Sequence, residues 1–303
     1  MSTVIESALN GVQFGLMLSL LAAGLTLVFG IMDMINLAHG SLYMFGAYLT
    51  AALVEPTGSF LLAMLVALLA TAALGMLLET TVLRTLYQRD HLSQVLATFA
   101  LILIGNEVVR MIWGPQPRRL ALPELFSGPV DLAGIQYPSY RLLVIGVGLA
   151  VALLLYLVVA RTRVGMWVRA GASNREMATV MGVDIKRLFT LVFGLGALLC
   201  AVAGALLGPL LSVQVGMGES ILILAFVVVV IGGIGSIRGA LAGSLMVGMV
   251  DTVGRTLVPG ALGTVFSPSV ASNLGPTLAS ILIYVLMAAV LFWKPQGLFP
   301  ARG

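Results

Sequence analysis

The stretch INLAHGSLYMFG places amide, imidazole and phenol side chains close together, a few residues after a long apolar run. In a helix, Asn36, His39 and Tyr43 would share one face with the preceding Asp33, and small residues would continue that face: Gly40, Gly46 and Ala47. Such neutral groups can hold a small polar solute weakly and release it. We expect Asn36, His39 and Tyr43 to line a solute path. Packing is the alternative for them, and capping or packing is the preferred role for Asp33.

The sequence contains no recognisable catalytic, metal-binding or nucleotide-binding motif. No Ser-His-Asp set, HExxH motif or paired-aspartate site accompanies the two histidines, His39 and His91, so we expect no enzymatic activity. A lone histidine on its segment and the single Cys200 predict no metal site. The glycine-rich IGGIGSIRG lacks the lysine of a P-loop, so the chain is expected to hold no nucleotide or other cofactor.

Composition indicates where these residues work. Of the 303 residues, 60% are hydrophobic and only 9% are charged, and the mean hydropathy is +1.10. Soluble domains carry roughly 25% charged residues. We therefore expect an all-α integral membrane protein, because the alternation typical of a membrane barrel is absent. The sequence has no basic region outside the predicted membrane segments, so we expect no nucleic-acid partner. The expected surroundings of the chain are membrane lipid.

The apolar runs predict a polytopic helical bundle of about eight to ten transmembrane helices, with nine as the best count. The whole chain, 1–303, forms one transmembrane domain in this interpretation. The second and seventh spans are the weakest, and the second could re-enter the membrane instead of crossing it. The predicted spans are Gly11–Ile31, Met34–Val54, Phe60–Leu83, Leu92–Trp113, Leu142–Ala160, Leu188–Val213, Ile221–Ser236, Ala240–Val258 and Thr277–Trp293.

Basic residues predict the orientation, since those in short loops are retained in the cytoplasm. Placing 161–187 inside also places Arg84, Arg89, Arg238 and Lys294 inside with Arg302, which makes eleven of the 16 Lys and Arg residues. The C-terminus is then cytoplasmic, and the polar connection 114–140 is external.

Small residues and spaced charges predict how the helices pack. Small residues recur at every fourth position in two runs, which favours close helix contacts; they are Gly196, Cys200, Gly204 and Gly208, then Gly235, Gly239 and Gly243. Two pairs have the spacing of ion pairs on one helix, Glu107 with Arg110 and Asp251 with Arg255. Glu79 has no partner at such a spacing.

The polar segment 161–187 has the pattern of a cytoplasmic docking element. Ser173 or Asn174 is a suitable N-cap for a short helix from Arg175 to Met181, and Gly182 would end that helix. Met177, Val180 and Met181 would lie on one side of it. A helix lying on anionic lipid is the alternative.

Three blocks together resemble the membrane permease subunits of bacterial ABC importers for branched-chain amino acids, the LivH type. The blocks are GLTLVFGIMDMINLAHGSLYMFGAYL, RAGASNREMATVMGVDIKRLFTLVFGLGALLCAVAGALLGPL and VVIGGIGSIRGALAGSLMVG, and the resemblance extends from about Gly11 to Gly297. Permeases of binding-protein-dependent importers carry a cytoplasmic E-A-A-x-x-x-G element that docks into the ATPase. Glu176, Ala178 and Gly182 match it, with Met177 replacing its first Ala and without the Pro that often ends it.

The resemblance implies a non-catalytic, multi-pass permease subunit in the bacterial inner membrane that transports branched-chain or other small amino acids. Its implied partners are a second, similar permease chain, two cytoplasmic ATPases that bind ATP and Mg, and an external substrate-binding protein. The alternatives are a permease for urea, amides or organic acids, and a stand-alone channel or proton-coupled carrier.

Overall fold

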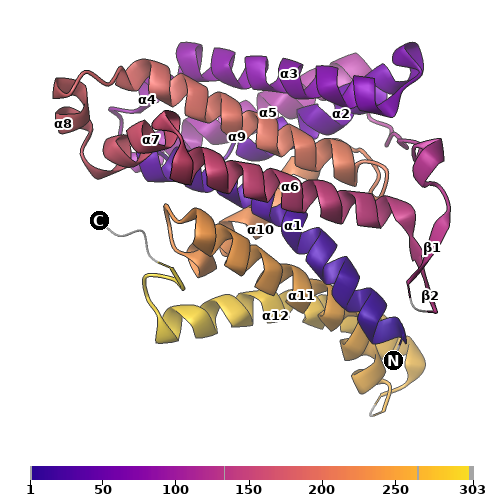
Figure 1. The fold of residues 1–303 in the computed structure, drawn as a ribbon. Helices are drawn as coiled ribbons and strands as arrows, with labels where there is room; N and C mark the ends of the chain where they lie inside the picture. Colours follow the sequence, from indigo (N-terminus) through magenta and orange to yellow (C-terminus); the bar gives the residue numbers. More distant parts are fainter. Residues whose placement is uncertain (1, 133, 265, 300–303) are drawn as a thin grey trace.

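The computed structural model describes residues 2–132, 134–264 and 266–299, which form a bundle of long helices (Figure 1). A two-stranded antiparallel hairpin pairs Pro129 with Pro138 and Leu132 with Ile135. In chain order the elements are α1 (Ser2–Met32), α2 (His39–Thr57), α3 (Phe60–Leu78), the π-helical turn η1 (Glu79–Leu83), α4 (Arg84–Leu86), α5 (His91–Trp113), the 3-10 turn η2 (Glu124–Phe126), β1 (Pro129–Leu132), β2 (Ile135–Pro138), α6 (Ser139–Arg161), α7 (Arg163–Ser173), α8 (Arg175–Val180), α9 (Ile185–Leu207), α10 (Met217–Gly232), α11 (Ile237–Leu262) and α12 (Pro268–Trp293).

The helices confirm a polytopic helical membrane protein. Within the described residues, seven helices are long and apolar enough to cross a membrane. The other two candidates are α2 and α10, which coincide with the two weakest predicted spans. Length and composition identify seven of the nine predicted crossings, and the total of nine stays a prediction. The seven segments are Thr3–Met32, Phe60–Leu86, His91–Trp113, Ser139–Arg161, Ile185–Leu207, Ile237–Leu262 and Pro268–Trp293.

Side-chain caps determine where several helices begin. At each of these starts a side-chain oxygen accepts a hydrogen bond from a backbone N–H in the first turn, which otherwise has no partner inside the helix. The capping residues are Ser59 for α3, Asp90 for α5, Thr162 for α7, Asn174 for α8, Asp184 for α9 and Ser236 for α11.

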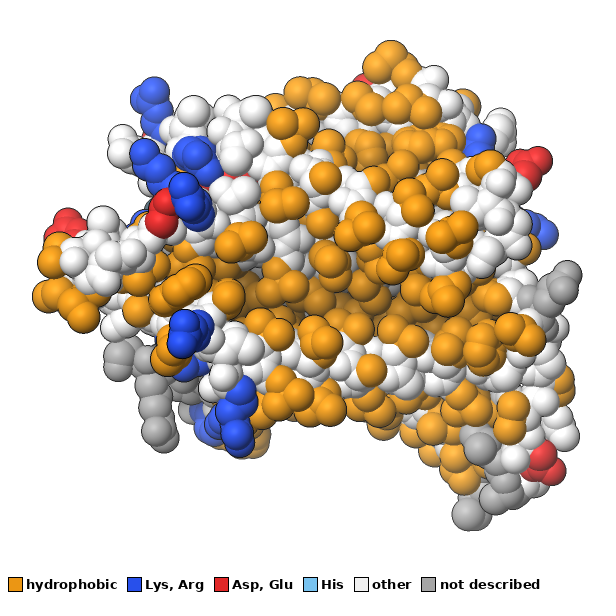
Figure 2. All heavy atoms as spheres, turned by 45° about the horizontal axis from the view of Figure 1, so that its top comes forward, with side chains coloured by type: hydrophobic (Ala, Val, Ile, Leu, Met, Phe, Trp, Pro, Cys, Tyr) orange, Lys and Arg blue, Asp and Glu red, His pale blue; other side chains and the backbone are white. Residues whose placement is uncertain are grey.

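The helices α1 and α9 form the centre of the bundle. In their most apolar parts, 83% of α1 and 78% of α9 are buried, and α1 contacts α6, α9, α10 and α11. The helices α3, α5, α6 and α12 lie at the periphery and expose many leucines. Figure 2 shows this apolar surface over the middle of the molecule, where membrane lipid would surround the chain.

The helix α2 begins inside the bundle, not at its end. The ring of His39 lies against Gly24 of α1 and Gly196 of α9, and Gly196 is the central residue of α9. The preceding residues are not helical: Asn36 Oδ1 accepts a hydrogen bond from the backbone N of Ala38 at 3.0 Å, a local turn that competes with helix formation. The predicted helix over Met34–Val54 therefore starts too early.

The two ends of the bundle differ in character. In Figure 1, α7, α8 and the end of α12 lie at one end, and the β1–β2 hairpin and the start of α1 lie at the other. Figure 2 shows most of the visible Lys and Arg side chains gathered at the α7–α8 end. This uneven distribution is the basis for assigning sides of the membrane.

Candidate functional site

Two helices begin next to each other within the bundle, and Gly40 and Gly218 are the second residues of α2 and α10. A Cβ atom on Gly218 would overlap the carbonyl group of Gly40, and a Cβ on Gly40 would overlap the carbonyl of Gly218. Only glycine permits this approach. Because backbone N–H groups at a helix start lack partners within the helix, both helices present partial positive charge here.

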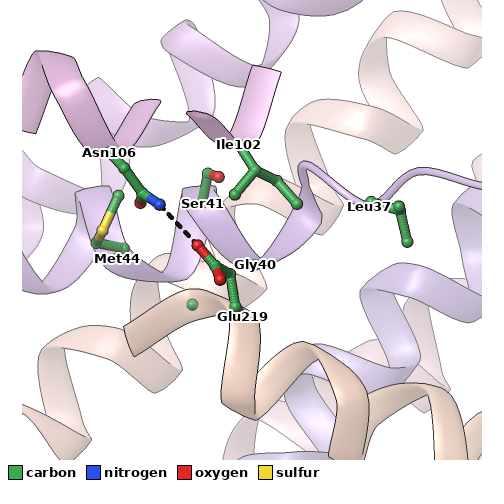
Figure 3. Close-up of a pocket in the computed structure, with 8 residues that line it drawn as sticks. Leu37, Gly40, Ser41, Met44, Ile102, Asn106 and Glu219 are labelled. Carbon is green, nitrogen blue, oxygen red and sulfur yellow. Dashed lines mark hydrogen bonds between the residues drawn. The ribbon is translucent and has the colours of Figure 1, made fainter. Parts of the chain in front are cut away.

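A polar cluster borders this crossing (Figure 3). Asn106 of α5 donates from Nδ2 to Glu219 Oε1 at 2.6 Å, so α5 is joined to the first turn of α10. Ser41 of α2 is 8% exposed, and its Oγ points toward Gly105 of α5. Among the described residues the Ser41 hydroxyl has no hydrogen-bond partner. We call Ser41, Asn106 and Glu219 the crossing cluster.

Apolar side chains complete a recess around the crossing cluster, and they come from Leu37, Met44 and Ile102. The recess is too narrow to contain a water molecule in this conformation. It nevertheless combines a carboxylate that can accept hydrogen bonds, a hydroxyl that can donate one and two positive helix starts. Such a set can contact both charged groups of a small zwitterion once the helices separate.

Of the residues predicted to line the path, Asn36 precedes α2, and His39 and Tyr43 lie on a side of α2 that faces α1 and α9. Asn36, His39 and Tyr43 are 0%, 0% and 1% exposed. His39 packs between α1 and α9, and Gly204 of α9 lies against the backbone of Tyr43. Asn36 Nδ2 and both ring nitrogens of His39 have no hydrogen-bond partner among the described residues. Their contribution to the path stays a prediction, and in this conformation they are enclosed by the chain itself.

Asp33 does not cap α2. It follows the last residue of α1 with a left-handed φ of 50°, and its N–H donates to Phe29 O at 3.0 Å. The residue before α2 is Ala38, which provides no side-chain cap. The capping interpretation is therefore wrong, because the chain needs several further residues to reach the start of α2.

The glycines predicted to pack helices lie at close contacts. Gly196 faces Gly24, Gly204 faces Tyr43 and Ala47, and the other four contacts follow: Gly208 with Leu120, Gly235 with Gly30, Gly239 with Gly232, and Gly243 with Val228 and Gly232.

The helix α8 presents apolar side chains at the end of the molecule. Asn174 Oδ1 accepts from Met177 N at 2.9 Å, and Gly182 ends the helix with a φ of 88°. Val180 and Met181 are 82% and 77% exposed. Of the three motif residues, Ala178 is buried, Glu176 lies in the first turn, and Gly182 has open space around it.

Residues 7–291 match the family described as the permease component of branched-chain amino acid transport systems. The chain belongs to this permease family. It is 29% identical to the high-affinity branched-chain amino acid transport system permease protein BraD of Pseudomonas aeruginosa, over 97% of this chain and 95% of that one. It is 31% identical to the corresponding protein LivH of Escherichia coli, over 82% and 85%. The solved structure of PsaBC from Streptococcus pneumoniae in complex with Fab is similar over 95% and 91% of the chains, with 14% identity and a TM-score of 0.47.

Two predicted ion pairs form in the permease. Arg110 Nη1 lies 2.9 Å from Glu107 Oε1, and Arg255 Nη2 lies 2.8 Å from Asp251 Oδ1. Glu79 has no ion-pair partner three or four residues away among the described residues, as its spacing indicated, but it does have one further along the chain. The π-helical turn brings Arg84, five residues later, to 3.0 Å from the Glu79 carboxylate.

Sequence reasoning missed the crossing cluster of the permease. Asn106 and Glu219 are 113 residues apart, and neither repeats at a spacing that suggests a pair. One signal for this cluster was present in the sequence: Glu219 lies in the polar stretch QVGMGES, directly before an apolar run. An acidic residue in the first turn of a helix is common, so Glu219 resembled an ordinary helix start.

Proposed function

We propose that this chain is the membrane-spanning, non-catalytic permease subunit of an ABC importer for branched-chain or other small amino acids. The observation that carries the proposal is the family match over residues 7–291. Two relatives that align with most of the chain are permeases of branched-chain amino acid transport systems, which supports this substrate class. ATP and Mg are bound by partner ATPases, whose hydrolysis drives the change between outward and inward access.

A second permease chain forms the other half of the pathway in this proposal. Asn106 lies seven residues before the end of α5, about 10 Å within the helix. Glu219 contacts Asn106 there and is exposed on the isolated chain. A carboxylate at this depth is unstable against lipid. A second, similar permease chain with a solute path between the two would cover it, and the family resemblance favours a different chain over an identical copy.

The ATPases dock at the α7–α8 end in this proposal. Exposed Met177, Val180 and Met181 lie beside the motif residues Glu176, Ala178 and Gly182. A cytoplasmic protein with an apolar groove would bury these side chains. In this proposal α8 lies in the cytoplasm and the β1–β2 hairpin lies on the external side of the bacterial inner membrane, where a substrate-binding protein would deliver the amino acid to the permease.

The helix starts at Gly40 and Gly218 support alternating access. Discontinuous helices whose N-termini lie inside a bundle are typical of transporters, because they place polar backbone groups at the solute without exposing them to lipid. The contact between Gly40 and Gly218 closes the recess. Separation of α2 from α10 would open it.

The test is uptake by the reconstituted complex. The chain would be co-expressed with the permease, ATPase and binding-protein genes that neighbour its own, and the purified complex placed in liposomes. We expect uptake of radiolabelled leucine that requires ATP and the binding protein. Uptake by this chain alone under a proton gradient would contradict the proposal and indicate a carrier. ATP-dependent uptake of urea, amides or organic acids without leucine would contradict the substrate class only.

A further inference from the structure

Glu219 carries a carboxylate that no cation of the described chain neutralises. Its Oε1 accepts a hydrogen bond from Asn106, which leaves Oε2 able to accept other donors. Arg110, on the same helix as Asn106, already donates to Glu107. A carboxylate within a membrane bundle needs a positive partner or water. Glu219 is exposed on the isolated chain, so any cationic partner of its carboxylate would come from outside the described chain.

The surroundings of Glu219 favour a group that also bears a negative charge. The N-termini of α2 and α10 meet at Gly40 and Gly218, so the recess next to the carboxylate has positive backbone potential. Ser41 is a largely buried residue whose hydroxyl has no hydrogen-bond partner among the described residues; it borders the same recess and can donate to an anionic oxygen. A metal cation or a polyamine would be repelled by these helix starts, whereas a zwitterion matches both charges.

The apolar lining fits the remainder of such a molecule. Leu37, Met44 and Ile102 border the crossing cluster and offer contact to a small hydrocarbon side chain. The ammonium and the carboxylate of an α-amino acid are attached to the same carbon atom, so once the recess opens one molecule can reach both Glu219 and the helix starts.

We infer that Glu219, oriented by Asn106, receives the ammonium group of the transported amino acid, while Ser41 and the starts of α2 and α10 receive its carboxylate. This inference rests on the proposed function and names the contact point within it. Asn106 is the positioning residue: its hydrogen bond occupies one carboxylate oxygen and weakens the hold on the ammonium group, so that the substrate can leave. Because the recess is closed here, binding occurs after α2 and α10 separate.

The first test measures uptake by the complete complex in liposomes. Replacing Glu219 by Gln removes the charge and keeps the shape. We expect Glu219→Gln to lower the maximal ATP-dependent uptake of radiolabelled leucine about tenfold, the factor that one hydrogen bond to a charged group contributes. The leucine affinity of the isolated binding protein should not change. Glu55→Gln, which alters an exposed carboxylate near the other end of α2, is the matched control and should transport normally.

The second test reports charge at the recess without transport of an amino acid. Ser41→Cys in a Cys200→Ser background should react with a cationic methanethiosulfonate faster than with an anionic one while the complex hydrolyses ATP. Adding Glu219→Gln should reduce this preference at least several-fold, because the attracting charge is gone.

These outcomes separate the inference from the proposed function. A wild-type complex without ATP-dependent leucine uptake contradicts the function, while the thiol test still measures the cluster. Normal uptake by Glu219→Gln in an active complex overturns the inference alone. The inference is also overturned if Ser41→Cys stays unreactive during turnover. Loss of the second permease chain from both the Glu219→Gln and the Asn106→Ala complexes would overturn it as well, because the cluster would then serve subunit packing.

Discussion

Replacement of Arg84 by leucine tests how much the buried ion pair at the π-helical turn stabilises the permease. The side chain of Glu79 is fully buried. Its Oε2 accepts from Arg84 Nη2 at 3.0 Å and from Thr190 Oγ1 at 2.6 Å. Its Oε1 accepts from Tyr87 Oη at 2.8 Å and from Arg84 Nε at 3.3 Å. Arg84→Leu would leave the carboxylate with two hydroxyl donors and no positive charge.

The expected loss follows from burial. Breaking a buried ion pair by removing one partner costs about 3–5 kcal/mol. The Arg84 side chain is 35% exposed, so solvent screens part of the interaction, and we expect a loss of about 2–3 kcal/mol in the free energy of unfolding. Arg187→Leu is the matched control, because the pair of Arg187 with Asp184 has side chains 86% and 53% exposed. It should cost less than about 0.5 kcal/mol.

The assay is unfolding of the purified chain in mixed micelles by titration with sodium dodecyl sulfate. The double variant Glu79→Leu with Arg84→Leu should recover part of the loss, because no charge then remains buried. Equal unfolding free energies for Arg84→Leu and Arg187→Leu would refute the reasoning and show that water or the hydroxyl groups satisfy Glu79 on their own.

Three further predictions concern the two ends of the bundle. Val180→Asp should reduce ATPase co-purification and uptake together, because burying a valine contributes about 1.5–3 kcal/mol to an interface. The hydrogen bonds that the Ser93 side chain and N–H donate hold the pKa of Asp90 below its ordinary value; the stability this gives is present at neutral pH and lost as the pH falls through that lowered pKa. The protection of amides at the start of α5 from exchange, measured by mass spectrometry and corrected for the intrinsic slowing of exchange in acid, should then fall. An impermeant maleimide added to intact spheroplasts should label Ser127→Cys and spare Ser173→Cys.

Each of these predictions has its own control. Leu125→Asp changes an exposed side chain at the opposite end of the molecule and should leave ATPase binding intact; normal binding by Val180→Asp would contradict docking at α8. The α8 cap, Asn174, does not titrate, so α5 and α8 responding alike to acid would contradict the Asp90 argument. The labelling uses a Cys200→Ser background, and the reverse labelling pattern would invert the proposed orientation.

Local patterns predicted the local features of this chain. Asn174 and Gly182 begin and end α8 as proposed, because caps depend on residues within one turn. The Asp251–Arg255 pair follows from helical spacing.

Local sequence patterns could not predict features that depart from α-helical periodicity or that join distant segments. The π turn adds one residue between Glu79 and Arg84, so counting by four missed their pair. The Asn36 turn moved the start of α2 and invalidated the projected helical face for Asp33 and Asn36. Ser41, Asn106 and Glu219 come from three helices, and only the folded bundle shows that they are neighbours.

The central position of α1 has a consequence for biosynthesis. This helix is made before every other described helix, and its principal neighbours, α9 and α11, are made about 150 residues or more later. Until then, Gln13, Ser19 and Thr26, which are buried in the finished protein, would face lipid or the insertion machinery. Contacts between such distant segments form slowly. Nascent chains shortened before α11 therefore lack the surface that covers α1, and we expect membrane proteases to remove them quickly, while full-length chains persist.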